Sequence, residues 1–216
     1  MSVDDTVSLE KVTSPAKATP RGRTRWARFG LTMGLSTAVA VFLAVLTANG
    51  VLAASFQISG MPFTVTATEL EGQGFQQYAT IDEMPEGSPN AGDTGGQVVV
   101  VVSVIGEAKL TNLCQSVNLG GGFLRITAGD NGTPVQATTL VVHSDEIQGD
   151  ASFQTIVIGQ DASTLDAVPG QPGALGVFGQ QAQHIRIRNL RQNNYATTAA
   201  VFTLPHLRIA FGSEGC

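Results

Sequence analysis

The stretch VVVVVSVI, residues 98–105, decides the class of fold that this chain can adopt. Its first five residues are all β-branched, and β-branched side chains lose rotamer freedom in a helix but pack well in a strand. Apolar residues occupy both alternating sets of positions, which is typical of a strand that is buried on both faces. We therefore predict a central β-strand over these residues.

Shorter alternating segments lie on both sides of this strand, and most of them end at Gly, Asn or Pro. They cover residues 56–67, 108–117, 124–128, 135–142, 153–158, 184–190 and 199–211. We predict an all-β domain with an antiparallel sandwich or barrel fold. A β-solenoid-like stack is the alternative, because a Leu or Ile followed by Gly or Asn recurs loosely along the chain.

The turns between these segments carry the strongest local signals. Gly129-Asp130-Asn131-Gly132 holds an Asn-Gly pair that tolerates positive φ, so we predict a β-hairpin between residues 124–128 and 135–142. Residues 166–179 repeat Gly around two prolines and predict a surface loop. Pro205 predicts a strand break or an edge strand, because proline cannot donate to a ladder.

The first part of the chain follows a different pattern. Four arginines, Arg21, Arg23, Arg25 and Arg28, precede twenty-five residues, 30–54, that contain no charge. At about 1.5 Å per residue, a helix of that length crosses a hydrocarbon core of roughly 30 Å. We predict a disordered basic cytoplasmic tail over residues 1–29, one N-terminal transmembrane helix or signal segment over residues 30–54, and an exported β-domain over residues 55–216.

The arginines orient this segment, because positive charge before a span keeps the N-terminus inside. The prediction is a single-pass protein of the cell membrane with a cytoplasmic N-terminus and an extracellular β-domain. The alternative is secretion after cleavage of a signal peptide, since small residues at Ala53 and Ala54 suit a signal peptidase. The length of the apolar run favours the retained anchor.

Charge and cysteines fit an exported domain. Residues 1–29 hold six basic against three acidic residues, a net of +3, whereas residues 55–216 hold six against fourteen, a net of −8. This acidic domain would repel nucleic acid and bare anionic lipid. Cys114 and Cys216 are the only cysteines, and in an oxidising compartment they predict one disulfide.

Motifs for catalysis, cofactors and metals do not emerge. The chain has no G-x-S-x-G, no Walker sequence and no H-E-x-x-H. No motif links His143, His184 and His206, so we interpret them as surface or edge histidines. Asp82, Glu83, Glu86 and Asp93 lack the spacing of an EF-hand, so residues 82–96 predict a solvated loop. We therefore expect no catalytic residue, no cofactor and no metal.

Three segments carry a resemblance to a known family: KLTNLCQSV at residues 109–117, IGQDASTL at 158–165 and FGQQA at 178–182. They look like those of an actinobacterial family of unknown function, some members of which carry the label cholesterol esterase. The resemblance implies no catalytic residues. It does imply a partner in the envelope, because members are often encoded near a small multi-pass membrane protein.

Together these observations lead to a functional expectation. We expect a non-enzymatic, membrane-anchored structural or interaction module of the cell envelope, which associates with itself or with an envelope protein such as a multi-pass membrane protein. The alternative is an envelope lipid-binding protein or lipid esterase, as the family label suggests. No nucleic-acid partner is expected.

Overall fold

The computed structural model describes residues 26, 29–30, 32–34, 36–38, 40–41 and 57–216. The chain divides into two units, Met1–Asn49 and Gly50–Cys216. The described residues of the first unit are helical, but within the described ranges no helix is both long and apolar enough to cross a membrane. Most of the predicted tail, all but residues 26 and 29, and most of the predicted span lie outside the described residues. So do the four orienting arginines and both cleavage-site alanines.

The second unit is built of strands, as the alternating pattern predicts. In chain order the elements are β1 (Phe63–Glu83), η1 (Gly92–Thr94), β2 (Gln97–Thr111), β3 (Leu113–Asn118), β4 (Phe123–Ala128), β5 (Val135–Gln154), β6 (Val157–Asp161), η2 (Ala162–Thr164), β7 (Phe178–Thr198), β8 (Val201–Thr203) and β9 (Arg208–Gly212). Both η elements are single 3₁₀ turns. Every pairing between these strands is antiparallel, which confirms the predicted all-β antiparallel class.

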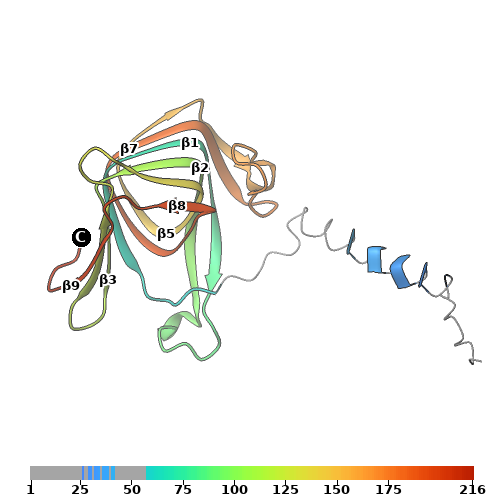
Figure 1. Ribbon diagram of the computed structural model, residues 1–216, viewed down its shortest axis with the longest axis horizontal. Helices are drawn as coiled ribbons and strands as arrows, with labels where there is room; N and C mark the ends of the chain where they lie inside the picture. The colour runs from blue at the N-terminus through green and yellow to red at the C-terminus, as the bar shows by residue number, and fades with distance from the viewer. Residues whose placement is uncertain (1–25, 27–28, 31, 35, 39, 42–56) are drawn as a thin grey trace, which may run out of the picture. The chain divides into compact units, whose positions relative to one another are not determined.

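Four unusually long strands organise the sheet. β1, β2, β5 and β7 contain 21, 15, 20 and 21 residues, against about 5–6 for an ordinary strand. The sheet runs β6-β7-β5-β2-β1-β3-β4-β9, β8 pairs with β5, and β7 also pairs with β1. The long strands thus pair in a closed circuit, and β3, β4 and β9 extend the sheet beyond β1 (Figure 1). A solenoid-like stack needs parallel neighbours, so these pairings contradict that alternative.

The second unit has its own apolar cores, and every residue in them belongs to that unit. The main cluster includes Phe75, Ile105, Leu140, Ile185 and Leu190, from all four long strands. A second cluster packs Val100, Val102 and Val104 against Val168. Since burying one such side chain contributes about 1.5–3 kcal/mol, these clusters supply the main stabilisation of the unit.

The valine-rich stretch lies at the centre of the sheet, as predicted, but it is buried on both faces only near its end. Ser103, Val104 and Ile105 are all buried, whereas Val99 is 70% exposed. Val99 pairs with Ile81 near the turn that joins β1 to β2, and β5 pairs with β2 only as far as Val101, so the side chains of Val99 and Ile81 are both exposed there.

The predicted hairpin around residues 129–132 is wrong in its pairing. The turn itself forms, with positive φ at Asn131 and Gly132, but β4 pairs with β3 and β5 pairs with β2. The chain instead reverses at residues 119–122, where the Leu119 amide donates to the Gly122 carbonyl. Residues 129–134 are therefore a loop between β4 and β5. These two strands run in the same direction and form one arm of a long hairpin, and β2 and β3 form the other arm.

The Gly/Pro loop of residues 166–179 also differs from the prediction, because part of it is packed rather than solvated. Val168 is buried, and its amide donates to the side chain of Gln76, which is itself completely buried. Gln76 Nε2 donates in turn to the Gln171 carbonyl. Gly173 is required by close packing, since a Cβ there would lie 2.6 Å from the Ala162 side chain and 2.8 Å from the Tyr78 ring.

Candidate functional site

The first concave feature is a trough across the outer face of the sheet, with a volume of about 670 Å³. Cross-strand register places Glu71, Lys109, Gln136 and Thr203 in one row across β1, β2, β5 and β8. Ser152 and Gln154 of β5 and His184 and Arg186 of β7 add to the polar lining, together with Gln73, Glu107 and Thr138. Ligand pockets of this size, about 300–1,000 Å³, are mostly apolar, so this trough has the character of a solvated groove.

Ion pairs hold one wall of the trough in place. Arg186 donates to Glu71, and its Nε lies 3.4 Å from a Glu69 carboxylate oxygen. The hydrogen bond to Glu71, with the negative charges of Glu71 and Glu69, raises the pKa of Arg186. These groups are substantially exposed, so their net contribution to stability is small. The pairs link β7 to β1.

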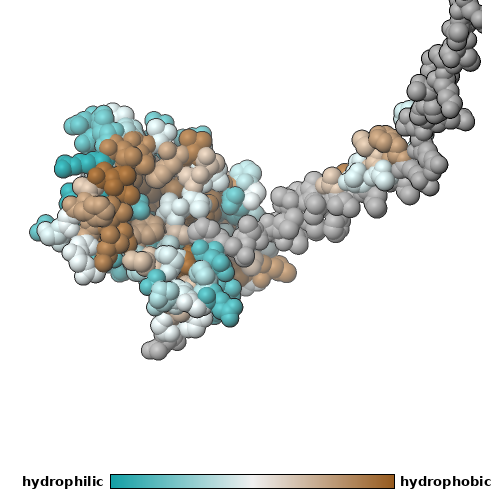
Figure 2. Space-filling model, turned by 60° about the horizontal axis from the view of Figure 1, so that its bottom comes forward, coloured by the Kyte–Doolittle hydropathy of each residue, from teal (hydrophilic) through white to brown (hydrophobic). Residues whose placement is uncertain are grey.

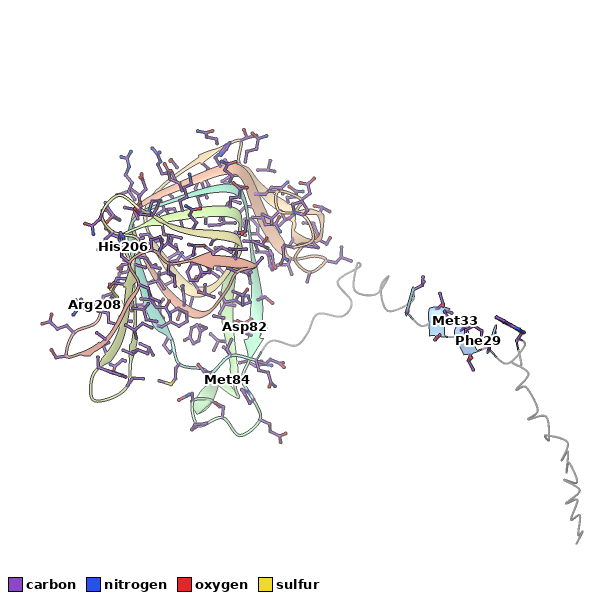
Figure 3. The ribbon with its side chains drawn as sticks, in the orientation of Figure 1. Phe29, Met33, Asp82, Met84, His206 and Arg208 are labelled. Carbon is purple, nitrogen blue, oxygen red and sulfur yellow. A yellow bond between two sulfur atoms is a disulfide. The ribbon has the colours of Figure 1, made fainter. Side chains whose placement is uncertain are left out.

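The second feature is a half-buried polar pair. His143 Nδ1 of β5 lies 2.7 Å from Asp82 Oδ2 at the end of β1, and Asp82 is only 7% exposed. Both residues therefore differ from the prediction: Asp82 belongs to a strand rather than a solvated loop, and His143 faces a carboxylate rather than solvent. Figure 3 shows Asp82 near Met84 at the lower end of the unit, away from His206 and Arg208.

The same end of the sheet holds the residues whose pKa is shifted by burial. Desolvation, followed by the nearby Asp82 charge, raises the pKa of Tyr78. Burial and the Asp145 carboxylate raise the pKa of Tyr195. Both changes keep the phenols neutral and therefore suit packing better than acid-base catalysis near neutral pH.

A His–Asp pair is part of the hydrolytic triad, which also needs a nucleophile beside the histidine. Ser144 follows His143 directly, but its side chain is completely buried. The other two histidines lie elsewhere: His184 lines the trough, and exposed His206 binds Asp130 at 2.6 Å. Nor do the described residues contain a group of three His, Cys, Asp or Glu side chains that could hold a metal.

The third feature is an exposed apolar surface on the sheet extension. Register across β1, β3, β4 and β9 aligns Phe63, Val117, Leu124 and Phe211 in one row, and Val65, Gln115, Ile126 and Ile209 in the next. Val65 belongs to the main core, but Ile209 and Phe211 are 58% and 79% exposed. We call Val117, Leu124, Ile126, Ile209 and Phe211 the β9 apolar surface. Figure 2 shows apolar side chains gathered on the left of the unit, where Figure 1 places β3 and β9.

The opposite face of this extension is held by the C-terminus. Cys114 of β3 forms a disulfide with Cys216, which confirms the pairing predicted from the cysteine count. The Cys216 amide donates to Ser116 Oγ at 2.9 Å, and Arg191 donates to the Cys216 carbonyl at 3.0 Å. The extension is therefore fastened at its base, while β9 stays exposed.

Sequence patterns predicted part of this arrangement. The segment after Pro205 alternates Arg208, Ile209, Ala210 and Phe211, and Pro205 itself suggested an edge. The pattern could not show that the face carrying Ile209 and Phe211 has no covering layer. The trough was missed altogether, because its lining comes from strands far apart in the chain.

Comparison with known proteins gives one match. The description "Family of unknown function (DUF6230)" fits residues 59–216, which is the whole β-rich unit apart from its first residues. No curated protein matches the chain. No solved structure matches it either.

Proposed function

We propose that the chain, which belongs to this family of unknown function, is a membrane-anchored module of the cell envelope that acts by association with other chains rather than by catalysis. Its β-rich unit lies on the outer side of the membrane and associates with further copies of itself. An envelope protein, including a multi-pass membrane protein, is the other partner class that the sequence suggested.

The observation that carries this proposal is the β9 apolar surface. Isolated exposed hydrophobic residues are ordinary, but a contiguous patch on a sheet face supports an interaction site. Here the patch continues the core face of β1 outward over three further strands, until Ile209 and Phe211 are largely exposed. In a chain with few charges, such a face favours burial against a partner.

The membrane location rests on the sequence. The uncharged run of residues 30–54 and the preceding arginines support an anchor with the N-terminus inside. The disulfide supports an oxidising compartment for the β-rich unit. An anchor also confines the copies to one surface, which raises their effective concentration.

The finer fold description follows from the closed circuit of long strands. Pairing of β7 with both β5 and β1 supports a barrel-like core over a two-sheet sandwich. The main core fills that circuit with side chains. A filled interior favours a structural or interaction role over carriage of a small ligand.

Lipid binding or lipid-ester hydrolysis is the second candidate, and the His143–Asp82 pair is the observation that favours it. A serine esterase also needs an accessible nucleophile beside the histidine. Ser144 is buried, and the lining of the large trough is polar, which does not suit an acyl chain. The association hypothesis therefore has the stronger support.

Sedimentation of the unit 50–216 tests the proposal. We expect its mass to rise with concentration up to about 1 mM, the effective concentration that a short tether supplies. Phe211→Ser should abolish the rise, whereas Ile158→Ser, which removes a comparably exposed side chain from β6, should not. A mass that stays monomeric would overturn the proposal, and ester hydrolysis that His143→Ala abolishes would favour the esterase instead.

A further inference from the structure

Three strands of the unit pair with a neighbour on one side only: β6, β8 and β9. An open edge presents unpaired backbone N–H and C=O groups, so it is a template for another strand. Proteins usually protect such edges with bulges, charges or very short strands. The three edges differ in how far they are protected.

β6 and β8 both carry protection. The pairing of β6 with β7 shifts register between Ile158 and Gln160, where Gly159 has a φ of +88°. A bulge of this kind twists an edge and disrupts further pairing. β8 contains only three residues. Neither edge offers a regular run of backbone groups.

β9 is the least protected edge. Its five residues pair with β4 without a register shift, and four of them are exposed. Its single charge is Arg208, while Ile209 and Phe211 are large apolar side chains. The short length and the charge of Arg208 are its protective features, and they limit the affinity of pairing rather than preventing it.

We propose that the β9 edge pairs with the β9 edge of a second copy of this chain, antiparallel and about a two-fold axis at Ala210. This inference rests on the proposed self-association and names an edge and a register for it, in which the β9 apolar surfaces of the two copies join into one face. In an antiparallel pair centred on Ala210, Ile209 of each copy lies opposite Phe211 of the other, and Arg208 lies opposite Gly212.

This register satisfies the side chains on both faces. Aromatic and β-branched residues are a favourable cross-strand pair, and the register forms that pair twice. The two arginines are separated by four residues along the strands, about 14 Å, so their repulsion is weak. Each arginine also faces a segment that reaches Glu214 two residues later. Two-fold pairing is self-complementary, as an isologous dimer requires.

Charge distinguishes a second copy from a lipid surface. Arg125 and Arg208 lie beside each other on the face opposite the β9 apolar surface, with Glu214 nearby. Binding of these arginines to anionic lipid would weaken with added salt. Two copies that each carry a net charge of −8 repel one another, so their association should strengthen with salt.

Cross-linking of the unit 50–216 tests the register. Ala210→Cys should form a disulfide-linked dimer under mild oxidation, because paired Cα atoms about 4.5–5.5 Å apart fit a disulfide. Arg208→Cys is the matched control, since its two copies would lie too far apart to bridge. We expect a dimer band for Ala210→Cys at least tenfold stronger than for Arg208→Cys, and stronger with added salt.

The outcomes separate this inference from the proposed function. Two results would overturn the β9 register but keep self-association, provided that the wild-type unit associates. One is equal cross-linking at positions 210 and 208, and the other is cross-linking only at Ile158→Cys on β6. If the wild-type unit is monomeric and none of the cysteine variants cross-links, both the register and the proposed self-association are overturned. If Ala210→Cys does not fold, as judged by circular dichroism, a nitroxide on Arg208→Cys replaces it, and a spin separation outside about 10–25 Å contradicts the two-fold pairing.

Discussion

Removal of the Cys114–Cys216 disulfide is the most quantitative test of the unit's architecture. The bond closes a loop over a sequence separation of 102 residues. In the chain-entropy model, a loop of about 100 residues restricts the unfolded chain enough to contribute about 4.7 kcal/mol. Native disulfides measured in other proteins contribute about 2–5 kcal/mol, so we expect the double variant Cys114→Ala/Cys216→Ala to lose that amount.

The native contacts of the tail should change little in this variant. The Ser116 and Arg191 hydrogen bonds to Cys216 use backbone atoms, so substitution of the side chain leaves both partners present. The loss of stability should therefore come mainly from a freer unfolded chain. That predicts a larger denaturant slope m as well as a lower free energy of unfolding, since the uncrosslinked chain exposes more surface.

Urea unfolding of the unit 50–216, followed by circular dichroism, measures both quantities. The reduced wild-type unit is the matched control and should coincide with the double variant. A loss below about 1 kcal/mol with an unchanged m would refute the loop-closure argument, because it would mean that the unfolded chain is not restrained by this bond.

Three further predictions address the interior. The chain has only two tyrosines, and the pKa values of both Tyr78 and Tyr195 are raised, so ultraviolet titration of tyrosinate should place both above their ordinary value of 10.0. Because a raised pKa favours the neutral phenol of the folded state, stability should be complete below pH 10 and fall as the pH rises through the folded pKa. Tyr78→Phe should reduce that fall, and an identical alkaline profile in the variant would contradict the burial of Tyr78. Ser144 Oγ is buried without a hydrogen-bond partner, so Ser144→Ala should leave the free energy of unfolding unchanged or raise it by about 1–3 kcal/mol, whereas Ser116→Ala removes a bonded hydroxyl and should lower it. Gly173→Ala should cost about 1–3 kcal/mol, because its Cβ would overlap Ala162 and the Tyr78 ring, while Gly121→Ala, with open space around it, should have little effect; equal losses for the two glycines would show that the loop is not packed as described.

The sequence predicted local structure better than pairing. Residues 98–105 form the central strand because β-branched side chains constrain a segment wherever it lies. The Asn131-Gly132 turn also forms, yet its flanking strands choose other partners. Local turn chemistry decides φ and ψ, but the choice of partner depends on distant strands, and the glycines at 120–122 offered a second place for the chain to reverse.

The candidate sites show the same division. The disulfide could be predicted because Cys114 and Cys216 had no other partner in the chain. The His143–Asp82 contact joins residues 61 positions apart, on β5 and β1, which do not pair with each other, so no local pattern indicates it. Likewise, the alternation of Ile209 and Phe211 indicates an apolar face, but a one-dimensional pattern cannot show whether another strand covers it.

Hydrogen exchange of the β9 amides, measured on the wild-type unit 50–216 over a range of concentrations, tests the central claim most directly. If copies pair through this edge, the outward-facing amides among residues 208–212 become more protected as the concentration rises, while the edge amides of β6 keep constant rates. Exchange at β9 that does not depend on concentration, up to about 1 mM, would contradict the account.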